Sequence, residues 1–157
     1  MKKEKKSIII GCDHAAYELK NKIRDFLEKK GFEVTDAGVN GPESSDYPEF
    51  GARVARRVSG KEFEKGVLLC GSGIGMSMVA NRFPHVRAAL CRGLFDAVMS
   101  RRHNDANILV LGGRVTGDVL AFEILNAWLE TPFEGGRHQG RLDQFDEISF
   151  DDIGGHK

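Results

Sequence analysis

The apolar and polar positions of the chain follow two repeats in turn, one typical of buried strands and one typical of amphipathic helices. Short apolar runs predict five strands, at residues 7–12, 32–38, 66–70, 86–91 and 107–113. Between these runs the apolar residues recur at helical spacing, which predicts helices at 15–31, 49–60, 75–83, 94–103 and 118–130. Strands that are apolar on both faces and alternate with helices form parallel sheets. The pattern therefore predicts an α/β fold in which a five-stranded parallel sheet has helices on both faces.

The length of the chain, 157 residues, is enough for one domain with a sizeable core and too little for two. We therefore expect residues 1–157 to form a single domain, with its core over about 7–131 and a C-terminal tail over 132–157. Lysine plus arginine and aspartate plus glutamate both number 23, so no overall charge favours nucleic acid or an anionic membrane as a partner.

The start of the chain and its cysteines bear on the compartment. The apolar run Ile8–Ile10, after a lysine-rich start, is far too short for a signal peptide or a membrane span. The cysteines, Cys12, Cys70 and Cys91, are an odd number in a chain poor in cysteine, which indicates free thiols in a reducing compartment. We therefore expect a cytoplasmic protein with no membrane partner, whose thiols are available for chemistry.

Reactive side chains follow three of the predicted strands at the point where each strand ends. Asp13 and His14 follow the first strand, Cys70 ends the third, and Arg114 follows the fifth. Because ligands bind beyond the carboxyl ends of parallel strands, we expect these side chains to converge on one site. The structural alternatives are that Asp13 caps the first helix and that Cys70 is a small buried apolar residue. An acid, an imidazole, a thiol and a guanidinium together are more reactive groups than packing needs.

The glycine loop after Cys70 reads "GSGIG" over 71–75 and matches neither common nucleotide-binding motif. The dinucleotide fingerprint needs a third glycine where Met76 stands, and a P-loop needs a Gly-Lys-Ser/Thr sequence that is absent. What remains is a run of backbone N–H groups leading into a helix N-terminus, which can hold a phosphate or a developing oxyanion. A helix N-terminus also favours the thiolate form of a neighbouring cysteine, so the oxyanion interpretation suits Cys70.

Two further groups of polar residues do not belong at this edge of the sheet. His103 and Asn104 come just before the last strand, so they belong at its amino-terminal edge. A solvent-facing helix C-terminus and a contribution to the site of a second subunit both remain open for them. In the tail, one helical turn would place Arg137 and Arg141 on one face, either as solvated charge or as a clamp for a phosphate.

Several of these segments together resemble a known family. The chain contains "GCDHAA", "DYPEFG", "CGSGIGMSMVANR", "VRAAL", "RRHNDANILVLGGR" and "EGGRHQGR" in the order and at about the spacing seen in the family of ribose-5-phosphate isomerase B and the galactose-6-phosphate isomerase subunits. The similarity covers roughly residues 7 to 145. The resemblance implies a Rossmann-like three-layer fold, a homodimer or a dimer of dimers, and aldose–ketose isomerisation of a sugar phosphate with no metal and no organic cofactor.

The resemblance also implies a role for each matched position. Cys70 matches the base that moves a proton between C1 and C2, and His103 matches the residue that helps to open the sugar ring. The other matched positions are substrate or phosphate contacts: Asp13, His14, Gly71, Ser72, Gly73, Ile74, Gly75, Asn104, Arg114, Arg137 and Arg141. Some relatives lack the cysteine and carry a glutamate where Met76 stands here, so this chain resembles the cysteine-base branch.

Three hypotheses of function remain at this point. The first is interconversion of ribose 5-phosphate and ribulose 5-phosphate through an enediolate. The second is isomerisation of a six-carbon substrate, allose 6-phosphate or galactose 6-phosphate, since pocket depth is not visible in a sequence. The third is a non-catalytic sugar-phosphate-binding protein, which the presence of Cys70 disfavours. If His103 and Cys70 act together, a second subunit must supply one of them, and the tail 132–157 would then add phosphate ligands and dimer contacts.

Overall fold

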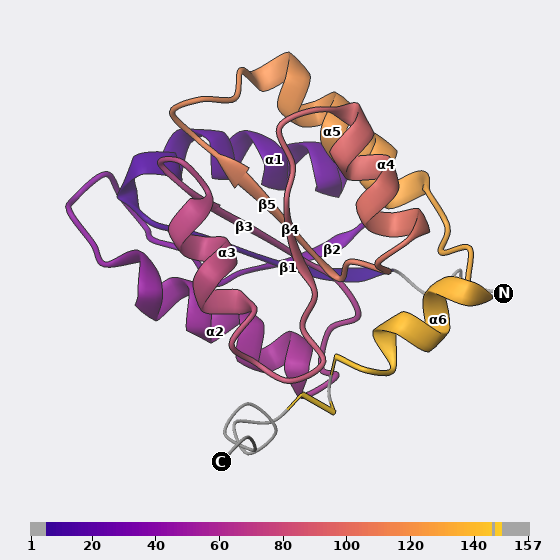
Figure 1. The fold of residues 1–157 in the computed structure, drawn as a ribbon. Coiled ribbons are helices and arrows are strands. Elements are labelled where there is room, and N and C mark those ends of the chain that lie inside the picture. The colour runs from indigo at the N-terminus through magenta and orange to yellow at the C-terminus, as the bar shows by residue number, and fades with distance from the viewer. Residues whose placement is uncertain (1–5, 146, 149–157) are drawn as a thin grey trace, which may run out of the picture.

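The computed structural model describes residues 6–145 and 147–148, and it confirms the five-stranded parallel sheet. The strand order is β2-β1-β3-β5-β4, with every neighbouring pair parallel (Figure 1). The strands are β1 Ser7–Cys12, β2 Glu33–Asp36, β3 Gly66–Cys70, β4 Ala88–Leu90 and β5 Ile108–Gly112. After β1 the chain adds β2 on one side of it, and the later strands β3, β5 and β4 lie on its other side. The direction of strand addition therefore reverses between β1 and β3. In open α/β sheets ligands bind at the carboxyl ends of strands on either side of such a reversal.

Helices cover both faces of the sheet, as the sequence predicts. The helical elements are η1 His14–Ala16, α1 Tyr17–Lys29, α2 Tyr47–Ser59, α3 Ile74–Ala80, α4 Leu94–Arg102, α5 Asp118–Glu130 and α6 Arg137–Leu142. On one face α1, α4 and α5 pack together, and on the other α2 packs on α3 (Figure 1). The short helix α6 lies beyond the sheet, near the end of α4.

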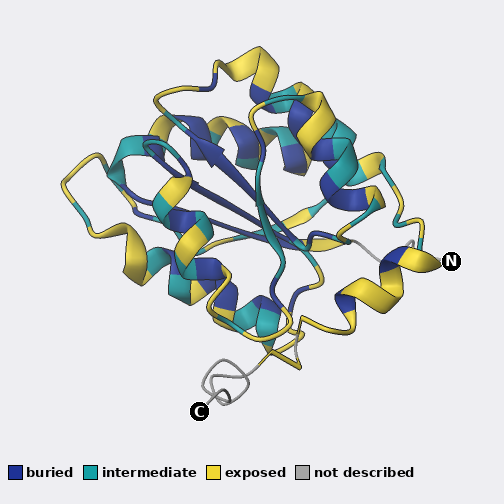
Figure 2. Ribbon diagram, in the orientation of Figure 1, coloured by how far each residue is buried: buried dark blue, intermediate teal, exposed yellow. Residues whose placement is uncertain are grey.

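The core is double, because the strand residues alternate between two apolar layers. Ile8 and Ile10 belong to the cluster under α1 and α5, whereas Ile9 belongs to the cluster under α2 and α3. In β3, likewise, Leu69 faces the first cluster and Cys70 the second. Figure 2 shows the resulting pattern, with buried strands at the centre and helices whose outer faces are exposed. This two-sided burial explains why β1, β3 and β5 read as unbroken apolar runs, whereas the edge strand β2 does not.

Lys20 of α1 is buried although the helical pattern places it among polar positions. Its side chain is 2% exposed, and Nζ donates to Asp36 Oδ2 at 2.7 Å and to the carbonyl oxygen of Val39 at 3.0 Å. A buried ammonium needs such partners, because burying a charge without an ion-pair or hydrogen-bond partner costs a large desolvation free energy. The pair fixes the segment that leaves β2.

No helix among residues 6–145 and 147–148 is long and apolar enough to cross a membrane.

Candidate active site

The carboxyl ends of β1, β3 and β5 meet, and the loops that follow them are joined by backbone hydrogen bonds. The register pairs Cys70 with Gly112. The N–H of Gly113 donates to the carbonyl oxygen of Cys70 at 2.7 Å, and the N–H of Arg114 donates to that of Gly71 at 3.0 Å. On the other side, the N–H of Asp13 donates to the Leu69 carbonyl at 3.3 Å. The structure therefore brings the predicted residues of these strand ends together at one edge.

Cys70 lies at the centre of this edge with its thiol turned into the glycine loop. Its side chain is 5% exposed, and Sγ accepts the N–H of Gly73 at 3.2 Å. One residue further on, Ser72 Oγ accepts the N–H of Ile74, the first residue of α3, at 3.2 Å. The thiol and a backbone N–H group of the glycine loop are therefore in direct contact.

Two glycines allow the loop after β3 to lie this close to β5. Gly73, the residue before α3, has a φ of +79°, in the left-handed region that side chains disfavour. At Gly112, a Cβ atom would stand 2.7 Å from the carbonyl oxygen of Ser72. Glycine at both positions therefore lets β5 and the loop after β3 lie in contact.

The substrate-contact candidates of the first strand are held by short local bonds. Asp13 is buried, and its carboxylate accepts the N–H of Ala15 at 3.0 Å, so it does cap the first helical turn, η1. His14 is fixed from the loop before α2, because Ser45 donates its N–H to His14 Nδ1 at 3.1 Å. The N–H of His14 in turn donates to Ser45 Oγ at 3.1 Å. Sequence reasoning missed Ser45, since nothing in "ESSDYP" indicates a contact 31 residues away.

Arg114 and Tyr47 complete the surroundings of the glycine loop. The Arg114 side chain lies over Gly71, where a Cβ atom would be 3.4 Å from Arg114 Cδ. The ring of Tyr47 lies against Gly75, where a Cβ atom would be 2.5 Å from Tyr47 Cε2. Tyr47 stays 39% exposed, so its ring also faces outward. A guanidinium and a phenol therefore flank the loop, and Tyr47 was not among the predicted site residues.

The remaining candidates lie at the opposite, amino-terminal edge, as the sequence predicts for His103. The start of β5, Ile108, pairs with Gly66, whereas its end pairs with Cys70. The strand alone thus places about 13 Å between these two levels, and His103 precedes Ile108 by a further five residues. Arg137 and Arg141 lie on α6 near the end of α4, away from the carboxyl end of β5 (Figure 1). One chain therefore does not bring these side chains to Cys70.

The turn that carries His103 and Asn104 is held by two arginines through Asp105. Asp105 has a φ of +44° and accepts from Arg101 Nη1 at 2.8 Å and from Arg87 Nη2 at 3.3 Å. Arg87 Nε also donates to the carbonyl oxygen of Asn104 at 3.0 Å. Beside Asn104 opens a cavity of about 700 Å³, lined mainly by the segment from Asn81 to Ala89. The amino edge is thus a side-chain network next to a hollow surface.

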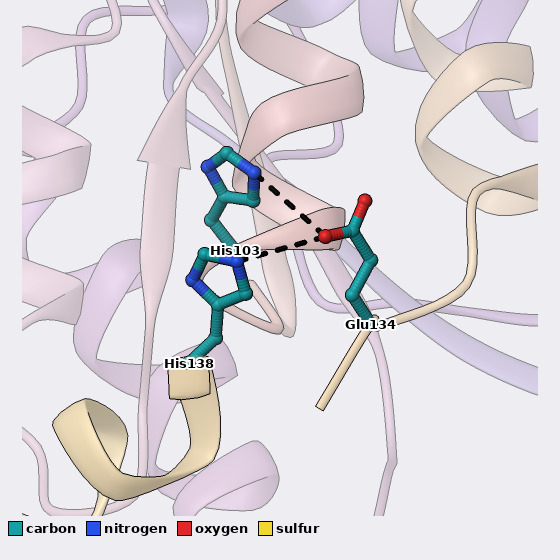
Figure 3. A group of neighbouring side chains, drawn as sticks. All are labelled: His103, Glu134 and His138. Carbon is teal, nitrogen blue, oxygen red and sulfur yellow. Dashed lines mark ion pairs between the residues drawn. The ribbon is translucent and has the colours of Figure 1, made fainter. Parts of the chain in front are cut away.

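His103 stacks on a second imidazole, that of His138 in α6. The ring centroids are 4.2 Å apart and the planes differ by 13°. Glu134 Oε2 lies 4.0 Å from His103 Nε2 and 3.6 Å from His138 Nε2 (Figure 3). Burial, His103 and Arg137 together lower the pKa of His138, against a smaller opposing effect of Glu134.

Two histidines and a carboxylate are ligand types that transition metals accept. The ligand atoms of His103, Glu134 and His138 all lie within 4.8 Å of one another. However, ring planes only 13° from parallel send the nitrogen lone pairs side by side, whereas a shared ion needs them to converge. The arrangement fits two imidazoles that face one carboxylate better than it fits a metal centre.

Comparison with known proteins places these residues in context. The family model described as Ribose/Galactose Isomerase matches residues 8–145. Ribose-5-phosphate isomerase B of Escherichia coli (strain K12) is 44% identical over 143 residues, which cover 91% of this chain and 96% of that protein. The structure of Clostridium thermocellum ribose-5-phosphate isomerase B is similar with a TM-score of 0.89 at 51% identity, covering 90% of this chain and 96% of that one. The D-erythrulose-4-phosphate isomerase of Pectobacterium atrosepticum is 44% identical over 131 residues, or 83% of this chain and 86% of that protein.

Proposed function

This chain belongs to the ribose/galactose isomerase family, and from that premise we propose that it interconverts ribose 5-phosphate and ribulose 5-phosphate through an enediolate. The observation that carries the proposal is the Cys70 thiol, which accepts the N–H of Gly73 at the mouth of the glycine loop. Such a site joins a base to backbone donors that can hold a developing oxyanion.

The isomerisation itself needs one base and a cradle for two oxygens. The Cys70 thiolate takes the proton from C2 of the open-chain aldose, and the electron pair of that C–H bond moves towards the aldehyde oxygen to give the enediolate. The proton of the C2 hydroxyl passes to the oxygen on C1, the thiol returns the carbon-bound proton to C1, and the ketose forms. Backbone N–H groups over 71–75 stabilise the negative oxygen while it exists. We assign Asp13 and His14, at the end of β1, to contacts with the sugar hydroxyls.

Ring opening must precede this step, and we assign it to His103 of a second subunit. In a two-fold dimer the carboxyl edge of one chain and the amino edge of the other build two equivalent sites. Apolar side chains support such an interface, because Ile74, Met78, Leu94 and Phe95 of α3 and α4 are between 42% and 74% exposed. A homodimer, or a dimer of dimers, is therefore the active assembly proposed for this cytoplasmic enzyme.

The phosphate is assigned to the arginines. Arg137 and Arg141 lie four residues apart on α6, and both are exposed. Arginine grips phosphate oxygens with paired hydrogen bonds, and two guanidiniums on one helix face suit that task. Asn104 and Arg114 add polar contacts from the two edges of the sheet. In this proposal, the tail of the domain supplies phosphate ligands and dimer contacts through its residues up to 145. Residues 146 and 149–157 of the tail lie outside the described part of the chain.

Isomerisation in deuterium oxide tests the proposal. The purified protein is incubated with ribose 5-phosphate, allose 6-phosphate or galactose 6-phosphate, and the products are followed by proton NMR. We expect ribulose 5-phosphate with solvent deuterium at C1, because a protonated base exchanges with solvent before it returns the proton. Faster turnover of a six-carbon substrate would reassign the substrate, and absence of turnover on all three would favour a binding protein. Ketose without deuterium would contradict the enediolate.

A further inference from the structure

Glu134 connects the two parts of the amino edge that carry proposed site residues. It lies between α5 and α6, and its N–H donates to the carbonyl oxygen of Arg102, at the end of α4, at 3.1 Å. Its Oε1 lies 3.7 Å from Arg102 Nε, while Oε2 faces the stacked imidazoles of His103 and His138 (Figure 3). One carboxylate therefore serves both histidines.

The stacked imidazoles lie among positive charges. Two stacked imidazolium ions would repel each other, and Arg102, Arg137 and Arg141 add further positive charge from α4 and α6. Glu134 supplies the negative charge that faces both Nε2 atoms. His138 is the more buried ring, 5% exposed, and burial disfavours its charged form. His103 is the more exposed ring, with 39% of its side chain accessible, so it is the imidazole of the pair that can meet a ligand.

We propose that Glu134 is a positioning residue for ring opening, which orients the His103 ring by facing Nε2 with its carboxylate. This rests on the role of His103 proposed above. With Nε2 turned towards Glu134, Nδ1 is the nitrogen that faces away and can meet a sugar (Figure 3). It donates its proton to the furanose ring oxygen as the C1–O4 bond breaks, and the imidazole then takes the proton of the C1 hydroxyl. The aldehyde forms, and His103 returns to its charged state.

An open-chain substrate separates this role from any other. In erythrose 4-phosphate the C4 oxygen carries the phosphate, so no hydroxyl is left to close a five-membered ring. Glu134→Gln removes the charge at nearly constant shape. The matched control is Glu130→Gln. Glu130 is the exposed last residue of α5, and its Oε1 lies 3.6 Å from Lys30 Nζ. Both variants and the wild type are assayed on ribose 5-phosphate and on erythrose 4-phosphate.

We expect Glu134→Gln to lower kcat/KM for ribose 5-phosphate about tenfold to a hundredfold, the range over which a group that supports general acid catalysis acts. Turnover of erythrose 4-phosphate stays within about twofold of wild type, because no ring must open. Glu130→Gln leaves both rates unchanged. Equal losses on both substrates would overturn the inference.

A direct measurement of ring opening does not depend on turnover of the tetrose. Cys70→Ala is used as background to stop isomerisation, and exchange between the α and β anomers of 1-¹³C-labelled ribose 5-phosphate is followed by NMR. We expect both Glu134→Gln and His103→Ala to slow the protein-dependent exchange about tenfold or more. If only His103→Ala slows it, Glu134 has no positioning role and the proposed function stands. If neither variant slows it, the ring-opening role of His103 falls and the inference falls with it.

Discussion

The two edges of the sheet are built from different kinds of group. At the carboxyl edge, backbone amides do the assembly: Gly73 donates to the Cys70 sulfur, and Gly113 and Arg114 tie one loop to the next. At the amino edge, side chains do it: Glu134 faces two imidazoles, and arginines hold the turn after His103. Backbone geometry follows from strand order and glycine positions, whereas a side-chain network needs particular residues from three separate segments. The first is a cradle of backbone groups, and the second is a side-chain network in which His103 and Glu134, at 39% and 49% exposed, can reach another molecule.

The comparison is tested most severely at Cys70. We expect Cys70→Ala to reduce kcat on the order of a hundredfold or more, because it removes the base while the loop and the arginines stay in place. Substrate affinity and the thermal unfolding midpoint change little, since the replacement is small and fits the same buried space. Steady-state kinetics, substrate titration and calorimetry check the three expectations. Turnover near the wild-type rate would remove Cys70 from the role of base.

Mixing subunits tests whether the two edges serve one site from two chains. Inactive Cys70→Ala and inactive His103→Ala proteins are combined under conditions that exchange subunits, and the activity on ribose 5-phosphate is measured. Random pairing makes about half of the dimers mixed, each with one complete site, so we expect recovery to about a quarter of wild-type activity. Native mass spectrometry of differently tagged subunits verifies the exchange. No recovery after verified exchange would mean that the edges do not combine between chains.

The arginines of α6 sharpen the contrast, because they are expected to recognise only the phosphate. Arg137→Ala and Arg141→Ala each remove a charge-assisted contact worth about 1.5–3 kcal/mol. Binding of ribose 5-phosphate therefore weakens about tenfold to a hundredfold, while the weak binding of free ribose does not change. Titration calorimetry with both ligands makes the comparison. The same loss for the free sugar would place these side chains elsewhere than at the phosphate.

Backbone conformation gives the smallest expected effect, on stability. Gly73→Ala puts a Cβ atom on a residue with φ of +79° and 2.5 Å from Leu90 Cδ1, so we expect a loss of about 1–3 kcal/mol in the free energy of unfolding. Gly117→Ala is the matched control, since Gly117 also precedes a helix, α5, and a Cβ atom there would meet no heavy atom of the described residues within 4 Å. Chemical denaturation compares the two. Equal stability of both variants would show that the cradle tolerates a side chain.

Most of the fold could be predicted because its determinants are local. The bounds of β3 and α5 match the apolar pattern residue for residue, and the ends of the longer runs were overestimated. The strand expected over 86–91 has ladder partners only over Ala88–Leu90, and the run 32–38 only over Glu33–Asp36. Beyond Asp36, the N–H groups of Ala37 and Val39 still donate to carbonyl oxygens of β1. Periodicity reports burial, and burial extends beyond the hydrogen-bonded ladder.

The candidate site was predictable only in part, for a related reason. Groups placed by strand ends, such as Cys70 and Arg114, follow from topology. Glu134 and Ser45 do not, because each acts on a residue 31 positions away, through a loop whose path the sequence pattern does not determine. The stack of His103 on His138 likewise joins the end of α4 to α6, and α5 separates these two helices in the sequence. Such contacts become visible only when the loops are placed in space.

At Gly73 and Gly112 the chain leaves no easy room for a Cβ atom, and every missense change of a glycine codon adds one. Every single-base missense change at these codons adds at least the Cβ atom of an alanine, so any amino-acid substitution meets the packing limit in one step. Substitution of these glycines can therefore disrupt the backbone conformation of the cradle, but it cannot change that conformation in small steps. Neighbouring codons are under no such limit: the hydroxyl of Ser72 accepts the N–H of Ile74, and threonine, one base away from every serine codon, would keep this bond. We expect purifying selection on the glycines and freer variation in the side chains between them.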